Sequence, residues 1–198
     1  MIYPDQFIPV LEKNGYVIDV DNFIWNKVCA CIKMMEDKGI EPVPISVNVS
    51  RMHVYQEKFT ENLKNMAGEY GIDPKYIPLE ITESAFTKEE GSLFKKVQSL
   101  QGYGFKFSMD DFGSGYSSLG MLKSERVDEV KIDKTFVDDI ATDKGKVLLG
   151  NVIRMINELG IDMIAEGVET KEQADFLKEN GCMYAQGYYY YKPMPIEE

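Results

Sequence analysis

The sequence has one histidine and three cysteines among its 198 residues, which narrows the chemistry open to it. His53 has no serine or cysteine in a suitable context nearby, so we do not expect histidine-assisted nucleophilic catalysis. Cys29 and Cys31 are two residues apart on a predicted helix, where their side chains diverge too far to share a metal ion. We predict reduced, buried thiols and a structural histidine.

Positive charge and long apolar runs are also scarce. The 22 Lys and Arg residues are outnumbered by 33 Asp and Glu residues, and the formal net charge of -11 argues against binding a DNA or RNA polymer through a basic patch. A phosphate ligand would need a metal ion or a focused lysine. No apolar stretch approaches the roughly 20 residues of a membrane span. We predict a cytoplasmic chain with no span of its own, although a longer parent protein could be membrane-anchored.

What the sequence does contain is an alternation of short apolar runs with stretches of helical periodicity. The predicted strands span 45–49, 77–81, 106–110, 129–132, 162–165 and 184–186. The predicted helices span 4–14, 21–38, 56–70, 88–101, 145–159 and 170–180. We expect one domain, residues 1–198, of the α/β class. A TIM-like β/α barrel has eight strands in about 250 residues, so six predicted strands make an incomplete barrel.

Polar residues recur where the predicted strands end, and β/α barrels carry their chemistry at that end of the strands. These residues are Asn48, Glu80, Asp110, Asp111, Lys131, Glu166 and Gln186. All are types that hold a metal ion or a phosphate, so we predict a functional site there.

Asp110 and Asp111 give the strongest single signal. Neighbouring side chains on a strand point to opposite faces, so both carboxylates reach one site only if the strand stops between them and the backbone turns. Gly113 and Gly115 supply backbone freedom just downstream. Adjacent carboxylates can bridge two divalent ions. A solvated Asp-rich turn is the alternative.

The other strand-end residues are each ambiguous alone. Glu80 closes an apolar run, where a metal ion would compensate its charge. Asn48 is either a ligand or a satisfied core amide. Lys131 either holds a phosphate or water, or pairs with a nearby acid. Glu83 lies beyond its strand and either fixes a loop or sits on the surface, and Gln186 remains open.

Together these residues resemble the EAL family of cyclic di-GMP phosphodiesterases through nearly the whole chain. The matching motifs are Phe-Ile-Pro at 7–9, Ser-Val-Asn-Val-Ser at 46–50, Leu-Glu-Ile-Thr-Glu-Ser at 79–84, Asp-Asp-Phe-Gly-Ser-Gly-Tyr-Ser-Ser-Leu at 110–119, Val-Lys-Ile-Asp at 130–133, Ala-Glu-Gly-Val-Glu-Thr at 165–170 and Ala-Gln-Gly-Tyr-Tyr at 185–189. The resemblance implies hydrolysis of cyclic di-GMP to linear pGpG in a barrel that holds two Mg2+ or Mn2+ ions.

The resemblance also implies a metal-ligand set. Asn48, Glu80 and Asp110 would bind one ion. Asp110 would bridge to a second ion, which Asp111 would also bind. Glu166 would act in the metal shell through water.

Three further roles follow from the resemblance. Lys131 would position the attacking water and contact the substrate, and Gln186 would complete the substrate site. Glu83 would anchor the Asp-Asp-Phe-Gly loop, which in this family couples metal binding to dimerisation. The catalytic set is then Lys131, Glu166 and Glu83.

One departure from the family pattern lies at the front. The Glu-x-Leu signature should precede the Phe-Ile-Pro segment, so we expect that this chain lacks it together with the first two strands. Open sheet edges would then favour a homodimer. The alternative function is a catalytically incomplete module that serves as a cyclic di-GMP receptor or a dimerising interaction domain. We also expect sensory or diguanylate cyclase-like domains in a longer parent.

Overall fold

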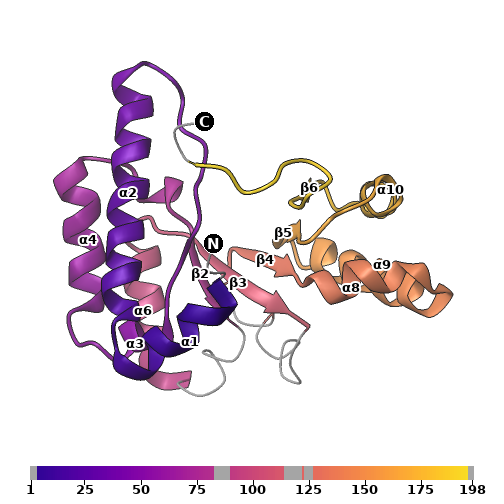
Figure 1. Cartoon of the computed structure of the whole chain (residues 1–198), viewed down its shortest axis with the longest axis horizontal. Coiled ribbons are helices and arrows are strands. Elements are labelled where there is room, and N and C mark those ends of the chain that lie inside the picture. The colour runs from indigo at the N-terminus through magenta and orange to yellow at the C-terminus, as the bar shows by residue number, and fades with distance from the viewer. Residues whose placement is uncertain (1–3, 83–89, 114–121, 123–126, 196–198) are drawn as a thin grey trace. The chain divides into compact units, whose positions relative to one another are not determined.

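Six short parallel strands form one sheet in the order in which they occur in the sequence (Figure 1). The computed structural model describes residues 4–82, 90–113, 122 and 127–195. Within these residues the sheet is open, which confirms the predicted α/β class and the six-stranded, incomplete arrangement. The strands are β1 Val47–Asn48, β2 Leu79–Thr82, β3 Phe107–Phe112, β4 Glu129–Ile132, β5 Asp162–Ala165 and β6 Tyr184–Ala185.

The helices lie close to their predicted positions. The long ones are α1 Pro4–Asn14, α2 Val17–Asp37, α4 Phe59–Tyr70, α6 Glu90–Gln101, α9 Asp143–Glu158 and α10 Lys171–Glu179. Four short elements were not predicted, because a helix of one or two turns shows no periodicity: α3 Arg51–Val54, η1 Pro74–Tyr76, α8 Lys134–Asp138 and η2 Asp139–Ala141. Helix α2 begins four residues before the predicted start, and its first residue, Val17, is buried.

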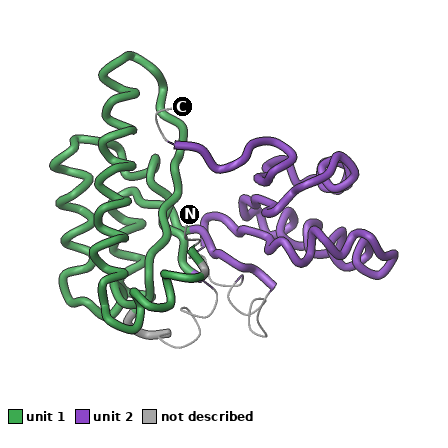
Figure 2. Tube along the Cα trace, viewed as in Figure 1, with its two compact units in different colours: residues 1–81, 89–107 green, residues 82–88, 108–198 purple. Residues whose placement is uncertain are grey.

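The chain divides into two compact units, residues 1–81 with 89–107, and residues 82–88 with 108–198 (Figure 2). In the first unit, α2 packs against α4 and β1. Trp25, Val28 and Ile32 recur at helical spacing on its buried face. Strands β1 and β2 are in register, with Asn48 beside Glu80. The backbone of this unit therefore brings two predicted metal ligands to neighbouring positions.

The second unit has its own core, built between strands β3 to β6 and helix α9. Leu149, Ile153 and Ile156 form the buried stripe of α9, and they belong to one apolar cluster with Val130 and Met163. Strand β4 pairs with β5, and β5 with β6, all in parallel. This parallel register brings the carboxyl ends of the strands to the same edge.

Helix α10 begins as the sequence predicts. The Thr170 hydroxyl accepts a hydrogen bond from the Gln173 backbone N–H at 3.2 Å, and the Gln173 side chain accepts one from the Thr170 N–H at 3.0 Å. This reciprocal cap satisfies two backbone donors that the helix leaves unpaired. Among the described residues, no helix combines the length and the apolar character needed to cross a membrane.

Candidate metal centre

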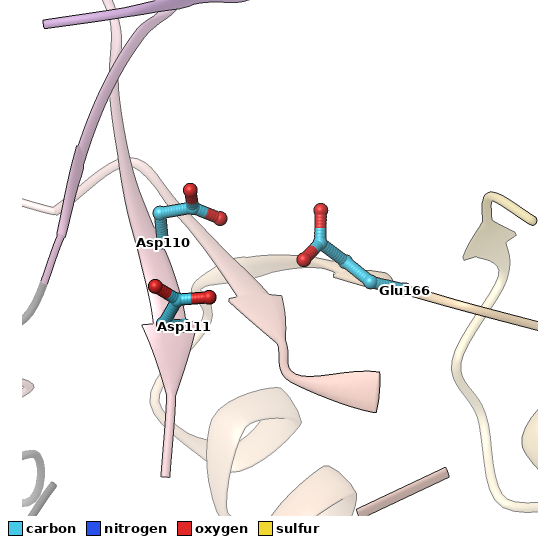
Figure 3. Close-up of side chains that lie close together, drawn as sticks. All are labelled: Asp110, Asp111 and Glu166. Atoms are coloured by element: carbon cyan, nitrogen blue, oxygen red, sulfur yellow. The ribbon is translucent and has the colours of Figure 1, made fainter. Parts of the chain in front are cut away.

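Asp110 and Asp111 direct their carboxylates to the same side of β3 (Figure 3). We expected the strand to stop between them, but β3 continues to Phe112. A β-bulge brings the two carboxylates together instead. Met109 pairs with Val130 and Phe112 with Ile132, so β3 has one more residue than β4 between these pairs. Asp111 lies within this bulge and adopts the left-handed backbone conformation, with a φ of 57°. The bulge rotates its side chain onto the face that Asp110 occupies.

Glu166 supplies the third carboxylate of the cluster. It follows β5 directly, and its backbone N–H donates to the Ile132 carbonyl at 3.0 Å, which fixes the chain at the end of the strand. One carboxylate oxygen from each of Asp110, Asp111 and Glu166 lies within 4.8 Å of the others. All three residues are partly buried. Three acids at this separation repel one another unless cations lie among them.

Lys131 provides one such cation. Its Nζ lies 2.6 Å from Glu166 Oε1 and 3.4 Å from Asp110 Oδ1, and its side chain is 7% exposed. The structure thus confirms the predicted ion pair, which does not exclude a role toward phosphate or water. Asp110 Oδ1 is buried and accepts no hydrogen bond from the described residues, although the Lys131 ammonium lies 3.4 Å from it. A carboxylate oxygen carries two lone pairs, so this oxygen can bind a metal ion while it contacts Lys131.

Gln186 joins the same group of residues through its side chain. Its Nε2 donates to Glu166 Oε1 at 2.5 Å, and its backbone N–H donates to the Ala165 carbonyl at 2.8 Å. Glu166 Oε1 is therefore held by both Lys131 and Gln186. A groove of about 600 Å³ adjoins this end of the sheet, lined by residues that include Lys134, Glu169, Gln186, Tyr188, Tyr191 and Lys192.

Asn48 and Glu80 belong to the first unit, where β1 and β2 place them side by side. Glu80 is 6% exposed, whereas Asn48 is exposed. Their convergence with the acids of the second unit stays a prediction. Glu83, the predicted loop anchor, lies outside the described residues.

Sequence reasoning missed the residues that support Asn48 from behind. Trp25 Nε1 donates to the Asn48 carbonyl at 3.0 Å, and Asp21 Oδ2 accepts from the Ser50 N–H at 3.2 Å. The only available signal was an acidic residue and a tryptophan on an otherwise apolar helix face, four residues apart. That pattern does not reveal which strand the helix faces.

The parallel sheet and the acidic cluster define an α/β protein with a candidate metal centre at its strand ends. The family model described as "EAL domain" matches residues 1–193. The chain belongs to the EAL family, as its motifs predicted.

Curated relatives include the oxygen sensor protein DosP of Escherichia coli, 35% identical over 196 residues, which cover 98% of this chain and 24% of DosP. The bifunctional diguanylate cyclase/cyclic di-GMP phosphodiesterase MucR of Pseudomonas aeruginosa is 31% identical over 199 residues, which cover 100% of this chain and 29% of MucR. The chain thus spans about a quarter of the length of these two relatives.

Solved structures give the same picture. The PaMucR phosphodiesterase in complex with c-di-GMP matches with a TM-score of 0.93 and 31% identity, over 99% of this chain and 80% of that one. An EAL domain protein from Listeria monocytogenes EGD-e matches with a TM-score of 0.85 and 29% identity, over 99% of this chain and 77% of that one. These likenesses confirm the predicted TIM-like β/α fold.

Proposed function

We propose that this chain is a cyclic di-GMP phosphodiesterase domain that hydrolyses cyclic di-GMP to linear pGpG. The observation that carries the proposal is the cluster of Asp110, Asp111 and Glu166, in which one carboxylate oxygen of each residue lies within 4.8 Å of the others. Relatives named as cyclic di-GMP phosphodiesterases, and a similar structure solved with c-di-GMP, identify the substrate class.

The donor set of the cluster fits hard divalent cations. Carboxylate oxygens are the ligands that Mg2+ and Mn2+ prefer, and within the described part of the chain the buried Asp110 Oδ1 accepts no hydrogen bond. Asp110 and Asp111 would hold two ions, Asn48 and Glu80 would add ligands to the first ion, and Glu166 would act through water. Ions held there would neutralise phosphate charge and lower the pKa of a bound water.

The remaining residues orient the reactants. Lys131 carries three N–H donors, so it can hold the attacking water while it stays paired with Glu166. Gln186 restrains Glu166 through its amide and borders the groove in which we place part of the nucleotide. Hydrolysis adds that water across one phosphodiester, forming one P–O bond and breaking another. We retain Glu83 as the anchor of the Asp-Asp-Phe-Gly loop.

We also propose that residues 1–198 act as one EAL-type domain in a longer parent protein, because the chain covers only 24% of DosP and 29% of MucR. Sensory or diguanylate cyclase-like domains would accompany it there. A homodimer and a cytoplasmic location complete the proposal.

The experiment is to incubate the purified chain with cyclic di-GMP in Mn2+ and, separately, in Ca2+. Binding is followed by calorimetry and product by chromatography. We expect linear pGpG with Mn2+, and its loss in the Asp110→Asn variant. Asp175→Asn is the matched control, because Asp175 is an exposed acid of α10 that pairs with Lys171 and does not belong to the acidic cluster. Binding of cyclic di-GMP without product in Mn2+ would favour the receptor function over the enzyme. The absence of both binding and product would contradict cyclic di-GMP as the substrate.

A further inference from the structure

Three polar or amphipathic side chains are buried behind β1 in the first unit. Asp21 is 7% exposed, and Trp25 and His53 are each 2% exposed. Asp21 and Trp25 lie one turn apart on α2, and His53 lies on α3. Asp is rarely buried to this degree unless it has a specific partner, so the cluster calls for an explanation beyond packing.

The partners of this cluster are the backbone groups on either side of Val49. Trp25 Nε1 donates to the carbonyl of Asn48, and Asp21 Oδ2 accepts from the N–H of Ser50. On the opposite edge, the Val49 N–H donates to the Glu80 carbonyl at 2.9 Å. The chain that carries Asn48 is therefore held between β2 on one side and α2 on the other.

His53 packs against the two α2 residues. Its ring centroid lies 4.4 Å from that of Trp25, and its Nε2 lies 3.4 Å from Asp21 Oδ2. Phe59 closes the cluster, with its ring centroid 6.0 Å from that of His53. Packing therefore fixes the orientation of the Trp25 indole and the Asp21 carboxylate. A residue that positions another residue needs such a fixed orientation.

We propose that Trp25 and Asp21, backed by His53, are positioning residues that set the Asn48 side chain for metal binding. The inference rests on the proposed function, because it takes Asn48 as a metal ligand. Strand β1 has only two residues, and an amide oxygen is a single, neutral ligand atom. Its placement depends on the backbone that carries it, and the cluster fixes that backbone.

A double-mutant cycle tests the proposal. Mn2+ alone is titrated by calorimetry into the chain, Trp25→Phe, Asn48→Ala and the double variant. Phe keeps an aromatic ring at this position, although it is smaller than Trp, and removes the N–H that holds the Asn48 carbonyl. We expect Trp25→Phe to weaken Mn2+ binding by about tenfold, the lower range for residues that orient a metal ligand. In the Asn48→Ala background it should weaken binding no further.

Thermal unfolding separates this role from a merely structural one. The hydrogen bond of Trp25 is to the backbone of residue 48, so the loss of stability should be equal in both backgrounds, whereas the loss of affinity should appear only with Asn48 present. Ile153→Val, in the apolar cluster of the second unit, is the control for a loss of stability that changes neither Trp25 nor Asn48. If Trp25→Phe does not fold, Asp21→Ala, which removes the acceptor of the Ser50 N–H, takes its place in the same cycle.

The outcomes separate the inference from the function on which it rests. Weaker binding in Asn48→Ala combined with unchanged binding in Trp25→Phe would overturn the inference and leave the ligand assignment standing. Equal losses from Trp25→Phe in both backgrounds would likewise overturn it. Unchanged binding in Asn48→Ala would overturn the ligand assignment and the inference together.

Discussion

Lys131 is the residue on which the electrostatics of the cluster depend. It lies between Asp110 and Glu166, nearly buried, so its removal leaves carboxylates facing one another. Breaking a buried ion pair from one side typically costs about 3 kcal/mol or more. We expect Lys131→Met to lower the free energy of unfolding by about that amount in EDTA, and excess Mn2+ to restore part of it. Chemical denaturation with and without metal measures both effects.

Lys134 offers the matched control for that prediction. It also contacts two acids, Asp138 at 2.9 Å and Glu169 at 3.0 Å, but its side chain is 42% exposed. Exposed pairs contribute about 1 kcal/mol at most, so Lys134→Met should change stability little and should not respond to Mn2+. Equal losses in the two variants would contradict the assigned role of Lys131.

Cys182 is buried, and burial raises the pKa of its thiol from 9.0 to about 11. Because the folded pKa lies above the unfolded one, the stability that this group contributes is present below pH 9 and is lost as the pH rises through about 11. At pH 8 roughly one thiol in a thousand is ionised. We expect no labelling of Cys182 by iodoacetamide at pH 8 until the protein is unfolded, as followed by peptide mass spectrometry.

The positive control is an exposed cysteine, introduced as Lys144→Cys at the start of α9, which should label within minutes under the same conditions. Rapid labelling of Cys182 in the folded chain would show that the thiol is accessible, and it would contradict the claim that burial raises its pKa.

At the scale of elements, the end of β3 is the most constrained segment of the site. Gly113 follows the bulge with a φ of +97°, and a Cβ there would lie 1.9 Å from an atom of the Phe136 ring. Gly113→Ala therefore combines left-handed strain of about 1 kcal/mol with a steric clash of about 1–3 kcal/mol. We expect a loss of about 2–4 kcal/mol in denaturant unfolding, with weaker Mn2+ binding because the bulge shifts.

Gly160 separates the two contributions. Its φ is +68°, but a Cβ there would meet no atom within 4 Å. Gly160→Ala should therefore show the backbone strain alone, with Mn2+ binding unchanged. If the two variants lost the same stability, the contact with Phe136 would not constrain the turn.

The elements of this fold could be predicted from the sequence wherever the signal is local. An apolar run such as residues 162–165 contains enough information to define β5, and Thr170 with Gln173 defines the start of α10. The bulge in β3 could not be predicted, because it arises from pairing with β4. Asp111 gives no local sign that it adopts a positive φ.

For the molecule as a whole, the motifs predicted the family and the polar strand ends, whereas their mutual geometry came from the structure. Lys131 could be located as a strand-end cation, but its pairing with both Asp110 and Glu166 depends on the parallel register of β3, β4 and β5. Trp25 was missed because its partner is a backbone carbonyl 23 residues away in the sequence.

The central claim is that the acids at the strand ends bind divalent cations. The most direct measurement is calorimetric titration of Mn2+ into the chain and into the Asp110→Asn/Asp111→Asn double variant, with Asp175→Asn as control. The account predicts saturable Mn2+ binding that the double variant loses and the control keeps. Mn2+ binding of unchanged affinity and stoichiometry in the double variant would contradict it.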